Sequence, residues 1–392
     1  MDSKNWIFSL MNKFIFFITL LVSISSSLSA NPNLKARTGI LMDYHSNETL
    51  FEMDADAQIY PASMTKIMTA IVAFDLIKKK KLSLDDQFIV SENAWRLSQA
   101  GYSSMFIMIN DTVLVEDLLR GIIIASGNDA CVALAEGIAG SEENFADMMN
   151  EKAGEIGMTS TNFTNSSGIN DPDNISTVRD IALMSKHLIQ NYPIYYELFA
   201  EKTFTWERTG GEPIKQGNRN PLLYKNVGVD GVKTGYLAVE KYSLASSMKK
   251  KDRRLIAVAS GFETKGTRSL ESLKLLNWGF RNTNTFEISK KGETFFELET
   301  WLGRKSKIST TTKEDFYVTV NKKDFRHLTV KLEYNGPISA PVDKGTEVAY
   351  IIVSNKDEII KKLPLYAVED LKKVNFFKSL LTSLNYLIWG DV

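Results

Sequence analysis

The stretch Tyr60-Pro61-Ala62-Ser63-Met64-Thr65-Lys66 places a serine and a lysine three residues apart, directly before the apolar run 67–76. That run is typical of a buried helix, so we expect Ser63 at or near the helix N-terminus. Residues three apart share a helix face, which brings the Lys66 amine within reach of the Ser63 hydroxyl. A serine becomes nucleophilic when a neighbouring base takes its proton, and a lysine can serve once burial and nearby cations lower its pKa. The segment indicates acyl-transfer chemistry, although a helix-capping serine beside a surface lysine has the same spacing.

Two further short segments follow in a fixed order. Ser126-Gly127-Asn128 separates the apolar stretches 118–125 and 130–139, so it predicts a tight link between two helices that presents a hydroxyl and an amide. Lys233-Thr234-Gly235 lies in the strand-like run 227–237, where a glycine admits a close backbone or ligand and the other two side chains can hold a carboxylate. An inter-helix turn and an ordinary exposed strand are the alternatives for each segment alone.

Taken together, the three segments resemble the motifs of D-alanyl-D-alanine carboxypeptidases, which are low-molecular-mass penicillin-binding proteins. The likeness covers roughly residues 35–283 and includes Val115-Glu116-Asp117-Leu118-Leu119, Ser126-Gly127-Asn128-Asp129-Ala130-Cys131, Phe163-Thr164-Asn165-Ser166-Ser167-Gly168 and Leu275-Leu276-Asn277-Trp278-Gly279-Phe280. It implies an α/β (α+β) fold, with a catalytic domain like that of the serine β-lactamases and penicillin-binding proteins.

The same resemblance implies roles for the residues of the first two motifs. Ser63 matches the acylated nucleophile and Lys66 its general base. Ser126 matches a proton relay, and Asn128 matches a residue that holds the substrate amide.

Five further positions match the substrate-binding part of the family's site. Lys233 and Thr234 correspond to residues that engage the terminal carboxylate, with Gly235 lining the cleft. Arg268 matches an arginine that serves the same carboxylate, unless it is simply a helix-surface residue. Tyr236 stands where the best-known members carry histidine, so the contribution of its side chain is open, while its backbone N–H would still serve an oxyanion hole.

The implied function is removal of the terminal D-alanine from peptidoglycan stem pentapeptides through a Ser63 acyl-enzyme, with β-lactams such as penicillin as covalent inhibitors. A D,D-endopeptidase or transpeptidase, a β-lactamase of the same fold and a non-catalytic wall-binding protein are the alternatives. Class A β-lactamases use a glutamate beyond the second motif, and none occurs here between Glu155 and Glu197.

The composition argues against other classes of protein. Lysine plus arginine, 47 residues, equals aspartate plus glutamate, so no basic field favours nucleic acid as a partner. The three histidines, His45, His187 and His327, form no ligand-like cluster, and the single Cys131 can build neither a disulfide nor a zinc site. We expect no metal and no cofactor, and we expect Cys131 to be a small core residue.

The N-terminus predicts a secretory signal over residues 1–30. Lys13 precedes the apolar run 14–22, and small residues follow up to Ala30. An uncleaved membrane anchor is the alternative. Both place the catalytic part outside the cytoplasm, on the periplasmic side of the inner (cytoplasmic) membrane.

Three regions are expected after the signal. Residues 31–283 read as the catalytic domain, and the alternating pattern of residues 284–366 predicts a small β-rich domain. Residues 367–392 predict an amphipathic helix whose apolar arc comprises Phe376, Phe377, Leu380, Leu381, Leu384, Leu387 and Ile388.

The size of this helix indicates how it would meet a membrane. About 15 residues reach about 22 Å, less than the roughly 30 Å hydrocarbon core, so we expect the helix to lie in the membrane surface as a peripheral anchor. Docking of the helix on the protein's own core is the alternative.

Overall fold

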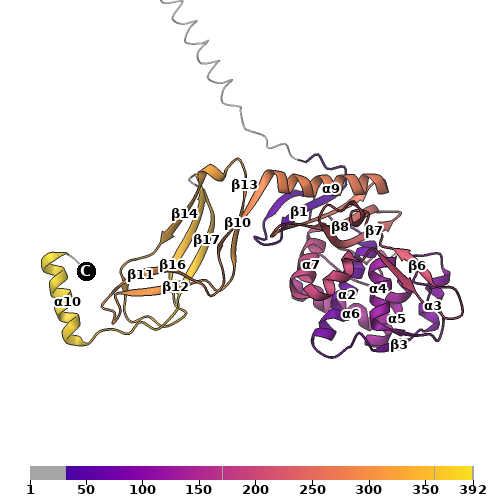
Figure 1. The fold of residues 1–392 in the computed structure, drawn as a ribbon, viewed down its shortest axis with the longest axis horizontal. Helices are drawn as coiled ribbons and strands as arrows, with labels where there is room; N and C mark the ends of the chain where they lie inside the picture. The colour runs from indigo at the N-terminus through magenta and orange to yellow at the C-terminus, as the bar shows by residue number, and fades with distance from the viewer. Residues whose placement is uncertain (1–31, 170, 357, 391–392) are drawn as a thin grey trace, which may run out of the picture. The chain divides into compact units, whose positions relative to one another are not determined.

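The structure, a computed structural model, describes residues 32–169, 171–356 and 358–390 (Figure 1). The predicted secretory signal over residues 1–30 lies outside the described residues. The mixed fold predicted from the sequence, with helices and a sheet followed by a β-rich region and a terminal helix, is confirmed.

A five-stranded antiparallel sheet forms the frame of the catalytic region, in the order β2-β1-β9-β8-β7. The strands are β1 (Thr38–Asp43), β2 (Thr49–Met53), β7 (Val229–Leu237), β8 (Lys241–Lys250) and β9 (Arg253–Phe262). Side chains alternate between the two faces of a strand, so Leu41 packs with α9 (Lys265–Asn282) while Ile40 and Met42 join the opposite core. Helix α9 covers one face, and α7 (Val178–Asn191) and α2 (Lys66–Lys78) lie against the other (Figure 1). Strand β7 is left at the edge of the sheet.

The helical core surrounds α2 (Lys66–Lys78), which buries every residue from Lys66 to Phe74. A helix that is buried on all sides lacks an amphipathic pattern, which explains why apolar residues occur on every side of it. The other helical elements of this region are η1 (Ala62–Thr65), α3 (Glu92–Gln99), α4 (Val115–Arg120), η2 (Gly121–Ala125), α5 (Asn128–Ala139), α6 (Glu142–Ile156), α7 (Val178–Asn191), α8 (Pro193–Tyr196), η3 (Glu197–Ala200) and η4 (Leu223–Lys225). Two small hairpins complete the region, β3 (Gln87–Ile89) with β4 (Thr112–Leu114) and β5 (Thr203–Trp206) with β6 (Ile214–Gly217).

The β-rich region contains a two-stranded and a six-stranded sheet. Strand β10 (Thr283–Ser289) pairs with β13 (Phe316–Asn321), and the larger sheet has the order β14-β16-β17-β12-β11-β15. Its strands are β11 (Thr294–Trp301), β12 (Lys307–Thr311), β14 (Leu328–Glu333), β15 (Ile338–Ser339), β16 (Glu347–Asn355) and β17 (Glu358–Ala367), with η5 (Phe325–His327) between β13 and β14. Ile351, Val353 and Leu365 lie at the centre of a separate apolar core.

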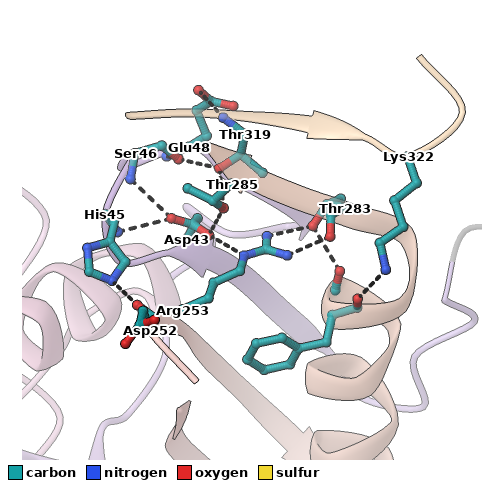
Figure 2. Close-up of polar contacts among 12 residues, drawn as sticks. Asp43, His45, Ser46, Glu48, Asp252, Arg253, Thr283, Thr285, Thr319 and Lys322 are labelled. Carbon is teal, nitrogen blue, oxygen red and sulfur yellow. Dashed lines mark hydrogen bonds and ion pairs between the residues drawn. The ribbon is translucent and has the colours of Figure 1, made fainter. Parts of the chain in front are cut away.

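A buried polar network links the catalytic sheet to the first strand of the β-rich region (Figure 2). The Asp43 carboxylate, which has no exposed surface, accepts hydrogen bonds from Arg253 Nε at 2.9 Å and from the Thr285 hydroxyl. Arg253 also donates to the carbonyl and hydroxyl oxygens of Thr283, and Thr319 contacts the hydroxyls of Ser46 and Thr285. Strand β10 is therefore tied to the ends of β1 and β9.

The terminal helix is shorter than the segment 367–392 predicted for it. Helix α10 spans Phe376–Trp389, and the residues before it return to the β-rich region, where Leu371 exchanges backbone hydrogen bonds with Val342 and Val374 donates to Leu302. Leu371 is buried, so this piece has a packing partner that the helical pattern did not reveal. No residue of α10 is buried, and no helix among the described residues is long and apolar enough to cross a membrane.

Candidate active site

Ser63 lies in the single turn η1, directly ahead of α2, as the sequence predicted. The preceding Ala62 has φ of 50°, a left-handed conformation that costs energy for a residue with a Cβ. Two glycines let other segments approach this turn closely: a Cβ at Gly168 would lie 1.9 Å from the Ala62 carbonyl oxygen, and one at Gly235 would lie 2.9 Å from that of Pro61. The third motif thus packs against the backbone that carries the serine.

Lys66 is the first residue of α2 and is only 1% exposed, so the alternative of a surface lysine is wrong. Its Nζ lies 3.2 Å from Ser63 Oγ and 2.6 Å from both Asn128 Oδ1 and the Ser167 carbonyl oxygen. A neutral amine has two N–H donors, which these two oxygens accept, and one lone pair. The lone pair then faces the Ser63 hydroxyl, as a base requires.

The surroundings of Lys66 favour that neutral form. Burial lowers the pKa of the Lys66 amine, and the nearby charge of Arg219 acts in the same direction, while Cys131, Asp129 and Glu142 oppose it. Burial also lowers the pKa of Lys233 well below its ordinary value, with Lys66 and Arg219 adding to the effect.

The second motif forms the predicted link between two helices. Ser126 ends η2 in a left-handed conformation, φ 62°, and Asn128 begins α5. The Lys233 amine donates to Ser126 Oγ at 2.9 Å, so the second and third motifs meet through a hydrogen bond. Cys131 is buried, as predicted, and its thiol donates to the Gly127 carbonyl.

Asp129 supports this turn from behind, a role that the sequence did not reveal. Its buried carboxylate accepts hydrogen bonds from the Ser104 hydroxyl and from the backbone N–H groups of Met105, Phe106 and Ile107. The segment before Met105 contributes Tyr102 and Ser103 to the pocket wall, so Asp129 fixes one side of the site.

The motifs open onto one pocket of about 670 Å³. It is lined by Ser63, Gly101, Tyr102, Ser103, Ser126, Asn128, Ser167, Gly168, Ile169, Arg219, Thr234, Gly235, Tyr236, Leu237, Ala238, Tyr242, Lys265 and Arg268. Lys66 and Lys233 are buried and hydrogen-bond to lining residues, Lys66 to Ser63 and Asn128 and Lys233 to Ser126. No carboxylate belongs to this lining. The basic residues of the lining are Arg219, Lys265 and Arg268, and within the described residues none of these three forms an ion pair with a carboxylate. Such a pocket favours an anionic ligand.

Arg268 and Tyr236 lie along the same wall. The Arg268 side chain is largely buried, 7% exposed, with its guanidinium 5.6 Å from the Tyr242 ring centre, so it is not a helix-surface residue. In the described part of the chain its buried Nε has no hydrogen-bond partner. Tyr236 is half exposed, and its ring centre lies 4.6 Å from that of Tyr242.

Ser167 and Arg219 are among the pocket residues that sequence reasoning missed. Ser167, whose carbonyl accepts from Lys66, lies in the segment 163–168 that already carried the family likeness. Arg219 follows β6 in a polar stretch with no periodic pattern, and its Nε donates to the carbonyl of Ala125 at 2.9 Å. Only the fold brings Arg219 to the second motif.

This constellation on a sheet flanked by helices defines a serine acyl-transfer enzyme of the penicillin-binding protein type. Residues 25–264 match the model of the D-alanyl-D-alanine carboxypeptidase family, Peptidase_S11, and residues 284–373 match that of the penicillin-binding protein 5 C-terminal domain. The first match spans more than half of the chain. The chain therefore belongs to the D-alanyl-D-alanine carboxypeptidase family and is a serine-type hydrolase.

Individual relatives agree with this assignment. The chain is 40% identical over 351 residues to D-alanyl-D-alanine carboxypeptidase DacC of Escherichia coli, a match that covers 88% of this chain and 86% of the relative. Its identity to DacA of Haemophilus influenzae is 35%, with 93% and 95% covered. The crystal structure of penicillin-binding protein 5 from Haemophilus influenzae has a TM-score of 0.82 at 35% identity and covers 88% of this chain and 99% of its own. The ampicillin-bound form of penicillin-binding protein D2 from Listeria monocytogenes has a TM-score of 0.57 at 28% identity, and the match covers 64% of this chain and 99% of that one.

Proposed function

We propose that the protein hydrolyses the bond between the two terminal D-alanines of a peptidoglycan stem peptide, with Ser63 as nucleophile and Lys66 as base. The observation that carries this proposal is the buried Lys66 amine, whose Nζ lies 3.2 Å from Ser63 Oγ and 2.6 Å from each of two acceptor oxygens. Removal of one proton by a positioned base contributes roughly 10²–10⁴ to a rate.

Binding would use the cations of the pocket. The terminal carboxylate of the peptide is expected to meet Arg268 and Thr234, with Lys233 below them, and Asn128 is expected to hold the substrate amide. The unpartnered Nε of Arg268 supports this placement, because a buried guanidinium gains most from a charged acceptor.

Acylation then proceeds in two steps. Ser63 Oγ attacks the scissile carbonyl while its proton passes to Lys66 Nζ, and the new oxyanion accepts hydrogen bonds from the backbone N–H groups of Ser63 and Tyr236. The C–N bond breaks next, and the departing D-alanine amine receives a proton through Ser126, which Lys233 contacts. Water hydrolyses the ester, returning the proton to Ser63 and releasing the shortened peptide.

A substitution of the nucleophile tests this assignment. A Ser63→Ala variant should show no covalent labelling by a fluorescent penicillin and no release of D-alanine from a pentapeptide, measured by mass spectrometry. Labelling of that variant at the wild-type level would refute the role of Ser63.

The protein is further proposed to be exported and held at the periplasmic face of the inner (cytoplasmic) membrane by α10. The exposed apolar side chains of this helix support the proposal, because the seven residues of its apolar arc are all exposed, among them Leu381 at 68% and Leu387 at 79%. The alternative of docking on the protein's own core is not what the structure favours, since no residue of α10 is buried.

Truncation after Val374 spares the pairing of Leu371 and tests the anchor. The truncated mature protein should leave the membrane fraction while it keeps its melting temperature and its hydrolysis of a small soluble peptide. Leu384→Asp on the apolar arc should weaken binding to anionic vesicles, whereas Ser383→Asp on the polar arc serves as the matched control. Retention of the truncated protein in the membrane would contradict the anchor.

A further inference from the structure

Glu240 is a buried carboxylate next to the active site that the proposed reaction does not use. It lies in the turn between β7 and β8 and is 5% exposed. Its oxygens accept from the Arg37 guanidinium at 2.7 and 2.8 Å, from the Ser260 hydroxyl at 2.7 Å and from the backbone N–H of Tyr60 at 3.3 Å. A buried carboxylate with this many donors is fully engaged and has one fixed position.

Its partners come from separate parts of the catalytic region. Arg37 precedes β1, Ser260 belongs to β9, and Tyr60 stands three residues before Ser63. Arg37 also donates to the carbonyl of Gln58, so the ion pair holds two points of the segment that leads to the nucleophile. Glu240 thereby fastens the β7–β8 turn to the backbone that carries Ser63.

The β7–β8 turn follows the strand that carries Tyr236, whose backbone N–H is the second donor of the proposed oxyanion hole. Tyr236 lies four residues before Glu240, in edge strand β7, which has β8 on one side only. The opposite side of β7 lies against η1, as the close approach of Gly235 to the Pro61 carbonyl demonstrates. The N–H groups of Ser63 and Tyr236 therefore belong to two separate segments. Glu240 accepts a hydrogen bond from Tyr60 in the segment that leads to Ser63, and it lies in the turn that follows the strand of Tyr236.

We propose that Glu240 is a positioning residue that sets the spacing between the backbone N–H groups of Ser63 and Tyr236. This inference rests on the proposed function, because it concerns the oxyanion that forms when Ser63 attacks. Oxyanion donors must lie at hydrogen-bond distance from the position that the charged oxygen reaches, so a small drift of one segment weakens the tetrahedral state more than it weakens substrate binding.

A carboxylate suits this place better than an amide does. Arg37 donates to both oxygens of Glu240, so the NH₂ group of a glutamine would face the Arg37 guanidinium in either orientation, and in one orientation it would also face the N–H of Tyr60. Glu240→Gln should therefore loosen the link between the two segments while it keeps the shape of the side chain.

The test compares the tetrahedral state with simple binding in the full chain. A peptidyl boronic acid forms a tetrahedral adduct with a serine, and the shortened product peptide only occupies the pocket. In Glu240→Gln, the acylation rate by a fluorescent penicillin and the affinity for the boronic acid should both fall by about tenfold or more, while the affinity for the product peptide changes by less than about twofold. Glu263→Gln is the matched control, because Glu263 pairs with Lys241 beside the same turn but is 72% exposed at its side chain.

Several outcomes would overturn the inference. Equal losses of boronic acid and product affinity would make Glu240 a general structural residue, and an acylation rate like that of Glu263→Gln would remove its role altogether. If Glu240→Gln does not fold, Arg37→Met takes its place, because the Arg37 side chain is 46% exposed. Arg37→Met should also weaken boronic acid binding more than product binding, by a smaller factor. Failure of the wild-type protein to be acylated by penicillin would instead refute the proposed function. That result does not depend on any Glu240 variant, so the two failures can be told apart.

Discussion

Replacement of Lys66 by methionine separates its catalytic role from its structural cost. The substitution keeps an unbranched side chain of similar length in a fully buried place and removes the amine. Acylation by penicillin should fall by roughly 10²–10⁴, the usual contribution of a positioned base. Two acceptors, Asn128 Oδ1 and the Ser167 carbonyl, lose a donor at 2.6 Å each, which costs about 1–3 kcal/mol apiece.

A second effect opposes that cost and depends on pH. Burial lowers the pKa of Lys66 from the ordinary 10.5, so between the lowered value and 10.5 the folded protein binds fewer protons than the unfolded chain. The free energy of unfolding therefore rises with pH over this window. Methionine abolishes the contribution of Lys66, and the variant should be destabilised less at neutral pH than at about pH 10.

Chemical denaturation of wild type and variant at both pH values measures this difference, with Lys81→Met as control because Lys81 is exposed in the turn after the same helix. A loss of stability that is identical at both pH values would refute the neutral, desolvated amine. Acylation at the wild-type rate in Lys66→Met would refute the base.

Two further predictions concern neighbouring charges. Arg268→Ala should slow turnover of a peptide with a free C-terminal carboxylate by the equivalent of about 1.5–3 kcal/mol, and it should affect the same peptide amidated at its C-terminus much less. Steady-state kinetics on the two peptides measure this difference, and an equal loss on both would mean that Arg268 is merely structural. Asp129→Ala leaves the backbone N–H groups of Met105, Phe106 and Ile107 without their acceptor. A thermal melt should therefore report a destabilisation of about 3–5 kcal/mol. A change below about 1 kcal/mol would mean that water replaces the carboxylate.

The sequence predicts the local parts of this site well because their chemistry is local. Ser63 and Lys66 share one turn, and the small residues of the second motif mark a helix junction, so both could be placed from spacing alone. Arg219 and Glu240 could not, because their partners Ala125 and Tyr60 lie about 90 and 180 residues away and no periodic pattern encodes such pairs. The helical pattern likewise did not reveal that Leu371, within the segment predicted as the terminal helix, forms an isolated antiparallel bridge with Val342.

The lone thiol beneath the second motif bears on the proposed export of the protein to an oxidising compartment. An exported protein with one unpaired cysteine risks mixed disulfides, because the thiolate is the species that attacks another disulfide. Burial raises the pKa of Cys131 to about 12, and the thiol has no exposed surface. Disulfide exchange requires a thiolate that reagents can reach, and Cys131 provides neither the ionised form nor the access. The folded protein should therefore resist alkylation by iodoacetamide and crosslinking through sulfur. Redox conditions outside the cytoplasm should leave the site unaltered.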